Sequence, residues 1–360
     1  MHRFHHRFVP PQSGRREIKM NQYHDYNYQD YSYQDYYTVP TTPPLKLSRV
    51  RWHIGIIAFA VVLVIILTSV AQILIHEVIL SSFPAVLENE WYMWALSSLP
   101  MYFVGMPLAF LLLCTIPKSA PQKRRLNPLM WVGFLCLCFA LSFAANFVGQ
   151  YISSWISFLT GAQVENELEQ MTVVTPLGIN ILFVGILAPI FEELFYRKAV
   201  IDRLRRYGDL PAILISGVIF GLIHGNLSQL FYATAVGILL SFIYVRTGSV
   251  LYTISIHSAF NMIGGVYTTE LLRRMGESLT PAEGDIVGEA MLMAYSIFVI
   301  FALVVGVIFL IANWRRFHRS LGQGEYTLTR EDWSNVIIAN PGTWVFVAMI
   351  AFLVLSSLLV

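Results

Sequence analysis

The strongest constraint on this chain is a series of apolar runs, each about as long as a bilayer is thick. A helix needs roughly 20 apolar residues to cross the hydrocarbon core. Hydrophobic residues make up 56% of the 360 positions. Charged residues make up only 13%, about half the share of an ordinary soluble protein. This composition excludes a soluble enzyme, a disordered regulator and a nucleic-acid-binding module. Nine runs are predicted to be membrane spans, near residues 54–75, 94–116, 128–151, 176–196, 210–224, 227–245, 250–268, 290–312 and 343–360.

We therefore expect an all-α fold, a polytopic transmembrane helix bundle of about eight or nine spans within residues 48–360. Residues 1–47 differ from the rest. They are rich in Tyr, Gln, Asp and Pro and repeat Tyr-Gln-Asp-Tyr at 28–31 and 33–36. A segment without apolar periodicity is predicted to be a disordered tail. No cleavable signal peptide is predicted, because the first long apolar run begins only near Ile54.

The distribution of basic residues predicts the orientation in the membrane. With nine spans and an inward N-terminus, all Lys and Arg except Arg273 and Arg274 fall on one side. Glu88 and Glu90 fall on the other side. Since basic residues are enriched in cytoplasmic segments, we expect a cytoplasmic N-terminus and an external C-terminus. The composition and the simple tail favour a bacterial plasma-membrane protein.

Polar residues inside the predicted spans are the candidates for chemistry, because an ionisable group there costs several kcal/mol. They are Glu192, Glu193, His224, His257 and Asn261. Glu193 and Arg197 are four residues apart, so they can form an ion pair on one helix face. Glu192 points about 100° away from Glu193 and is free to face a bundle interior. His257 and Asn261 are also four apart and project donors from one face.

A turn predicted at Gly208-Asp209 lies midway along the chain between Glu192 and His224. Glu192 precedes Gly208 by 16 residues and His224 follows it by 16. At about 1.5 Å per residue, two antiparallel helices place both side chains roughly 24 Å from the turn. A carboxylate and an imidazole at one depth can share and deprotonate a water molecule. His257 and Asn261 could then donate to the oxyanion formed on a peptide carbonyl. Such a set can hydrolyse an amide without a Ser or Cys nucleophile.

Other intramembrane protease signatures are absent. His76-Glu77-Val78-Ile79-Leu80 has Leu where a zincin needs its second His. Leu214 stands at the first Gly of a rhomboid-type GxSG, and the chain has no GxGD motif. Cys136 and Cys138 are expected to be small core hydrophobes.

Three motifs, Glu192-Glu193-x-x-x-Arg197, Phe220-x-x-x-His224 and His257-x-x-x-Asn261, resemble those of the CPBP family. This family comprises CAAX prenyl endopeptidases and bacteriocin-processing or self-immunity proteins. The resemblance covers about residues 175–265. It implies a helical intramembrane endopeptidase in which Glu192 and His224 activate water and His257 and Asn261 stabilise the oxyanion. Glu193, Arg197 and Asn226 are expected to support this site.

The resemblance leaves open whether the site binds a metal ion, since family members have often been described as metal-dependent. Two His and two Glu could bind zinc, with Glu192, His224 and His257 as the candidate ligands. We favour a site without metal or other cofactor, because Glu193 is engaged with Arg197 and Asn is a poor zinc ligand. The expected partners are the lipid bilayer and a membrane-associated peptide or protein substrate, and no nucleic acid. A prenylated substrate is disfavoured, because bacteria generally lack protein prenylation.

Two alternatives remain. A proton-coupled transporter would also bury Glu and His at mid-membrane, but it should show two related halves, and the polar pattern has no second copy. A non-catalytic immunity or scaffold protein could share the fold, although it would have no need to keep all four candidate catalytic residues.

Overall fold

The computed structural model describes residues 46–161, 167–276, 280–282, 284–326 and 328–357. All regular structure within these ranges is helical, which confirms the all-α helix bundle expected from the sequence. The predicted tail lies outside the described residues, apart from Lys46 and Leu47, where the first helix begins.

Each of the nine predicted spans falls on a helix, but the described residues contain only six helices long and apolar enough to cross a membrane. A bent pair, α14 (Arg330–Ile338) and α15 (Pro341–Ser357), makes a seventh if it is counted as one span. The remaining two segments are α9 (Asp209–Leu222), which has only 14 residues, and the helical stretch 250–275, which carries His257, Asn261 and charged residues near its end. The six helices that are long and apolar enough to cross a membrane are Leu47–Ser82, Tyr92–Leu113, Pro128–Leu159, Leu177–Tyr207, Leu227–Thr247 and Ile286–Arg319.

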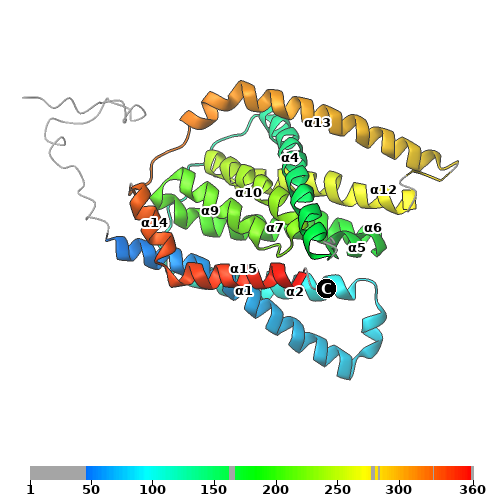
Figure 1. Ribbon diagram of the computed structural model, residues 1–360, viewed down its shortest axis with the longest axis horizontal. Helices are drawn as coiled ribbons and strands as arrows, with labels where there is room; N and C mark the ends of the chain where they lie inside the picture. The colour runs from blue at the N-terminus through cyan, green and yellow to red at the C-terminus, as the bar shows by residue number, and fades with distance from the viewer. Residues whose placement is uncertain (1–45, 162–166, 277–279, 283, 327, 358–360) are drawn as a thin grey trace, which may run out of the picture. The chain divides into compact units, whose positions relative to one another are not determined.

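The helices around the candidate residues pack closely against one another (Figure 1). α10 (Leu227–Thr247) packs against α9 on one side and α4 (Pro128–Thr160) on another. α4 in turn carries α13 (Ile286–Arg319), and α1 (Leu47–Ser82) packs against α15. Aromatic and aliphatic side chains fill the space between α4, α10, α11 (Val250–Asn261) and α13. They include Phe134, Leu137, Phe139, Leu240, Ile243, Ile256 and Ala302.

α9 and α10 form a close hairpin through glycines. A Cβ atom on Gly217 would lie 2.6 Å from the backbone nitrogen of Ile238, and one on Gly221 would lie 2.8 Å from the carbonyl oxygen of Leu230. Small residues four apart let two membrane helices approach to backbone contact. The hairpin therefore fixes the connection between α9 and α10, which carries His224.

Three stretches with wider, π-type turns interrupt the helices near the candidate residues. They are η5 (Ile181–Leu187), η6 (Glu193–Ile201) and η8 (Met262–Tyr267). The first two flank α7 (Ala188–Glu192), and the third directly follows Asn261. Such turns are rare and concentrate at functional sites. Here they change which residues of a span face inward.

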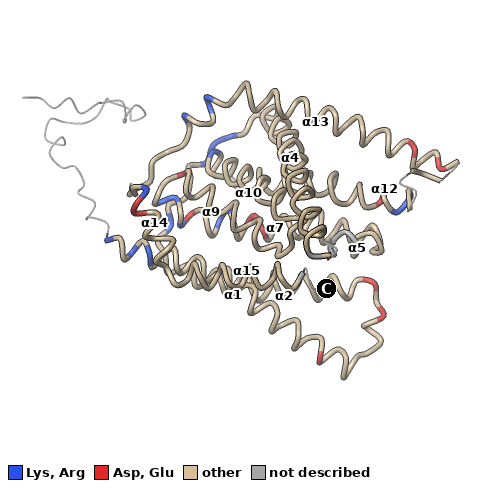
Figure 2. Tube along the Cα trace, viewed as in Figure 1, with Lys and Arg blue, Asp and Glu red and all other residues tan. Residues whose placement is uncertain are grey.

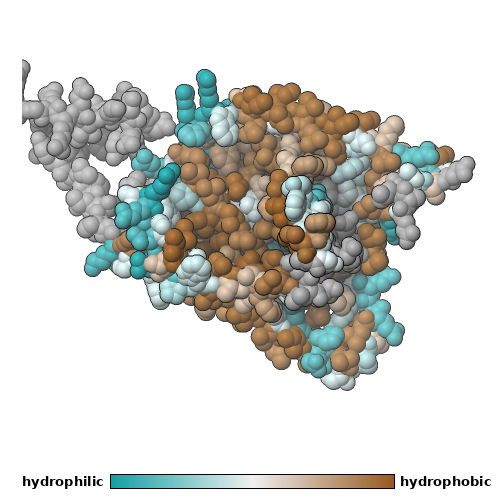
Figure 3. Space-filling view, in the orientation of Figure 1, coloured by the Kyte–Doolittle hydropathy of each residue, from teal (hydrophilic) through white to brown (hydrophobic). Residues whose placement is uncertain are grey.

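The surface agrees with a membrane location. Large apolar side chains such as Phe147, Ile311 and Leu251 are more than two-thirds exposed. The space-filling view shows a broad hydrophobic body with hydrophilic residues toward its ends (Figure 3). Most Lys and Arg of the helical unit gather at the end that holds the starts of α1 and α9, whereas acidic residues dominate the opposite end (Figure 2).

Candidate active site

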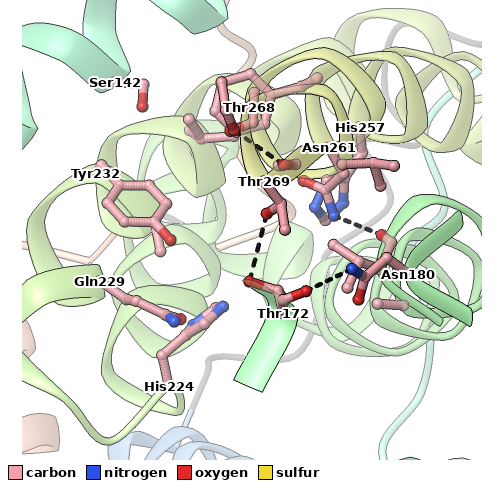
Figure 4. Close-up of a pocket in the computed structure, with 18 of the residues that line it drawn as sticks. Ser142, Thr172, Asn180, His224, Gln229, Tyr232, His257, Asn261, Thr268 and Thr269 are labelled. Carbon is pink, nitrogen blue, oxygen red and sulfur yellow. Dashed lines mark hydrogen bonds between the residues drawn. The ribbon is translucent and has the colours of Figure 1, made fainter. Parts of the chain in front are cut away.

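A cavity of about 960 Å³ collects all four candidate catalytic residues. Glu192 comes from α7, His224 from the α9–α10 connection, and His257 and Asn261 from α11. Glu192 and His224, which were predicted to lie at equal depth, both line this cavity. Figure 4 shows His224 on one side of this space and His257 and Asn261 on another.

The ion pair predicted between Glu193 and Arg197 is present and completely buried. Arg197 Nε lies 3.0 Å from Glu193 Oε2, and neither side chain has any exposed area. Arg197 Nη1 also donates to Ser216 Oγ at 3.3 Å, and the guanidinium carbon lies 4.7 Å from the centroid of the Phe220 ring. These contacts tie α9 to the span that carries both glutamates.

His257 contacts both glutamates through its two ring nitrogens. Its Nδ1 lies 3.1 Å from Glu193 Oε1, and its Nε2 lies 3.9 Å from Glu192 Oε2. Glu193 forms an ion pair with Arg197, and its carboxylate is suited to accept a hydrogen bond from the Nδ1–H of His257. Glu192 is the more accessible of the two carboxyl groups, with 16% of its side chain exposed against none for Glu193. The neighbouring carboxyl groups therefore have different roles: one orients the imidazole and the other faces the cavity.

His224 is oriented by the backbone of its own helix. Its Nδ1 lies 2.7 Å from the carbonyl oxygen of Phe220, which can only accept a hydrogen bond. Nδ1 therefore carries the proton, and in the neutral ring Nε2 keeps its lone pair. The Phe220 ring lies edge-to-face with both His224 and His257, at 5.1 and 5.7 Å between centroids. Phe220 thus contacts both imidazoles and also Arg197.

Asn261 and Asn226 each make a defined contact with the backbone. Asn261 Nδ2 donates to the carbonyl oxygen of Val184 at 2.9 Å. Asn226 Oδ1 accepts from the backbone N–H of Gln229 at 2.8 Å, which caps the first turn of α10. Asn226 also lines the cavity. Its cap fixes the start of α10 two residues after His224, which is the kind of supporting role expected of it.

Sequence reasoning missed a polar stripe on α4 that lines the same cavity. Ser142, Asn146 and Gln150 lie four residues apart and all face this space. Polar residues at i, i+4 and i+8 inside an apolar run are a readable signal, but the run 128–151 was interpreted only as a span. Asn180, also missed, lies 12 residues before Glu192 and lines the cavity with only 2% of its surface exposed.

The described side chains do not fit a zinc site well. Zinc in an enzyme is usually held by three protein ligands, and the described residues contain no group of three or more His, Cys, Asp or Glu arranged to hold a metal ion. His257 has one nitrogen on Glu193, and the Nδ1 of His224 is engaged with a carbonyl. The reaction proposed for this cavity therefore uses protein side chains and water, without a metal ion.

Comparison with known proteins matches the region that holds the candidate residues. The profile of the family described as "Type II CAAX prenyl endopeptidase Rce1-like" matches residues 175–263, which contain all three motifs. The resemblance to the CPBP family is confirmed. A Bacillus subtilis (strain 168) protein named "Putative membrane peptidase YdiL" is 26% identical over 208 residues, which cover 56% of this chain and 83% of that protein. No solved structure matches the chain significantly. The matched region thus comprises the span with both glutamates, the α9–α10 hairpin and α11, and it is similar to membrane proteases.

Proposed function

We propose that this protein is an intramembrane endopeptidase that hydrolyses a peptide bond of a membrane-associated peptide or protein. The observation that carries the proposal is the placement of Glu192 and His224 on one cavity, with His257 Nε2 3.9 Å from Glu192 Oε2. The membrane-protease family and the peptidase name of the Bacillus relative support the reaction class.

In the proposed first step, a water molecule attacks the carbonyl carbon of the scissile bond. The Glu192 carboxylate takes one proton from this water while the Nε2 lone pair of His224 orients it. The new C–O bond forms as the carbonyl electron pair moves onto oxygen. General base catalysis of this kind contributes about 10²- to 10⁴-fold in rate.

The resulting oxyanion needs donors. Asn261 can offer the second N–H of its amide, because only one of the two is needed for the Val184 carbonyl. His257 Nε2 can donate only when the ring is doubly protonated, since Nδ1–H is directed at Glu193. In the second step the C–N bond breaks, and Glu192 returns its proton to the leaving amine. The products are a carboxylic acid and an amine.

We also propose the orientation predicted from the sequence, with a cytoplasmic N-terminus in a bacterial plasma membrane. The gathering of basic residues at one end of the helical unit supports it. The relative from Bacillus subtilis supports the bacterial origin.

The test is cleavage of a library of membrane-tethered peptides by purified wild type, Glu192→Gln and Glu192→Ala. We expect cleavage by wild type and a loss of at least 100-fold in both variants, with unchanged thermal unfolding. Equal cleavage by wild type and Glu192→Ala would exclude the role given to Glu192. If wild type cleaves no peptide of the library, the result would favour a non-catalytic scaffold or a transporter. Ion-flux measurements in proteoliposomes would distinguish these two alternatives.

A further inference from the structure

The catalytic groups occupy only part of the cavity, and the rest of its wall combines apolar side chains with uncharged polar ones. Among the described residues that line it, Glu192, His224 and His257 are the only Asp, Glu, Lys, Arg or His side chains. Ser, Thr, Asn, Gln and Tyr side chains provide the other polar groups, most of them from α2 (Tyr92–Pro100), α4, α10 and α12 (Thr268–Met275). A charged side chain in this space would find no counter-ion outside the catalytic residues, and an unpaired charge at this depth is costly.

The stripe of Ser142, Asn146 and Gln150 on α4 has a spacing that fits a particular ligand. Residues four apart on a helix are separated by about 6 Å along the axis. In an extended peptide, backbone groups that point the same way recur every two residues, at about 6.6 Å. The three side chains cover about 12 Å, which matches five residues of an extended chain at about 13 Å.

The chemistry of the stripe fits the same ligand. An extended segment that displaces water from this space has backbone N–H and C=O groups that must find new partners. The amides of Asn146 and Gln150 each supply donors and an acceptor. In the part of the chain that the structure describes, neither of these amides has a hydrogen-bond partner in the protein.

A second wall carries an unpaired acceptor. Asn180 donates from Nδ2 to the carbonyl oxygen of Thr172 at 2.7 Å, which fixes the orientation of its amide. Its Oδ1 is buried and has no partner among the described residues. Figure 4 shows Asn180 and Ser142 on different sides of the space. A buried acceptor left unpaired costs about 1–3 kcal/mol, so a ligand N–H here would be favoured.

We infer that the cavity binds an uncharged peptide segment of about five residues in an extended conformation, with its backbone along Ser142, Asn146 and Gln150. This inference deepens the proposed function and rests on it. It also selects against a prenyl chain along this wall, because an apolar chain would leave the amides of Asn146, Gln150 and Asn180 without partners.

The test measures binding on a Glu192→Ala background, so that bound peptide is not consumed. The probe is a fluorescent ten-residue peptide of Ala, Ser, Gly and Phe, capped at both ends, and its affinity is followed by anisotropy in lipid nanodiscs. Asn146→Leu/Gln150→Leu removes both amides from the stripe. Ala144→Leu, exposed on α4 and outside the cavity lining, is the matched control.

We expect the double substitution to weaken binding at least tenfold and the control to change it less than twofold. A probe with alternate backbone nitrogens methylated should bind weakly to the parent, and the double substitution should weaken it by less than a further twofold. Since Asn146 is half-buried and Gln150 is exposed, thermal unfolding of the variant should match the parent.

Three results would overturn the inference. The folded stripe variant could bind the probe as tightly as the parent, or the parent could fail to bind the uncharged probe. An S-farnesylated probe could also bind more tightly, with an affinity that the stripe substitutions do not change. Cleavage of the unlabelled probe by wild type separates this inference from the proposed function. Stripe-dependent binding without cleavage contradicts only the protease activity, and cleavage without stripe dependence contradicts only the binding site.

Discussion

Asn261 donates to the backbone carbonyl of Val184, 77 residues earlier in the chain, across a 2.9 Å hydrogen bond. The reason lies in the wider turn of η5. The N–H of Ala188 reaches back five residues to the carbonyl of Phe183. If the next residue continued this pattern, the backbone N–H of residue 189 would donate to the carbonyl oxygen of Val184. Residue 189 is proline, which has no backbone N–H. The Asn261 side chain supplies the missing donor, so this residue has a structural contact as well as a candidate catalytic one.

The two roles of Asn261 can be separated by a pair of substitutions. Asn261→Leu should lower the free energy of unfolding by about 1 kcal/mol and reduce kcat for peptide cleavage. Adding Pro189→Ala restores a backbone N–H near Val184 and should recover much of the stability but not kcat. Thermal unfolding and steady-state kinetics on the four proteins of this cycle provide the measurement. Recovery of both quantities together would show that Asn261 acts only on the fold.

The buried pair of Glu193 and Arg197 should show strong coupling. Arg197→Met leaves a buried carboxylate without its main partner and should cost about 3–5 kcal/mol. Glu193→Gln should also destabilise, whereas the double variant Glu193→Gln/Arg197→Met should be more stable than Arg197→Met alone. Denaturant unfolding in detergent gives the three values. Lys198, which is 55% exposed at the next position, provides the control Lys198→Met, with an expected effect below about 0.5 kcal/mol. Additive losses in the double variant would contradict the coupling.

The two histidines should differ in how they respond to substitution. His257→Gln removes the ring that contacts both glutamates, so kcat should fall about 10²- to 10³-fold, as for loss of an oxyanion donor. His224→Gln should lower kcat by 10²-fold or more with KM little changed. Because His257 is 4% exposed and packed on Glu193, its variant should also unfold earlier, unlike that of His224. A variant of either histidine with wild-type kcat would remove that residue from the proposed mechanism.

Chelators should leave the activity intact. The described side chains offer no convergent three-ligand set, so we expect wild type to keep its kcat after dialysis against a zinc chelator. Elemental analysis of active protein should give well under one zinc per chain. Loss of activity that added zinc restores would establish a metalloprotease and replace the mechanism above.

Close packing in the α9–α10 hairpin predicts a large effect from a single methyl group. The Cβ of Gly221→Ala would clash with the side chain of Thr234 and lie 2.8 Å from the Leu230 carbonyl oxygen. Overpacking of this kind costs about 1–3 kcal/mol, and here it should also move His224 and lower kcat. Gly178→Ala, where no atom lies near the added methyl group, is the control. Equal thermal unfolding of the two variants would contradict the tight contact.

Much of the site could be predicted because helical spacing is local. Glu193 and Arg197 at i and i+4 pair as expected, and His257 and Asn261 reach one cavity from one helix. The π-type turns could not be predicted, because they depend on partners supplied by other segments, as Asn261 is for Val184. Phe220 belongs to the Phe220-x-x-x-His224 motif, but its contacts with both imidazoles and with Arg197 could not be predicted, because they depend on how α9 packs against other helices. The α4 stripe was visible in the sequence and was obscured by the strength of the apolar signal around it.

The size of the cavity bears on the supply of water to a hydrolytic reaction inside a membrane. At about 30 Å³ per molecule in the liquid, 960 Å³ corresponds to on the order of 30 waters. Each hydrolysis consumes one of them, so the cavity can serve as a local reservoir many turnovers deep. In the proposed hydrolysis the reactant water can therefore come from this space, and a peptide that enters must displace part of that water.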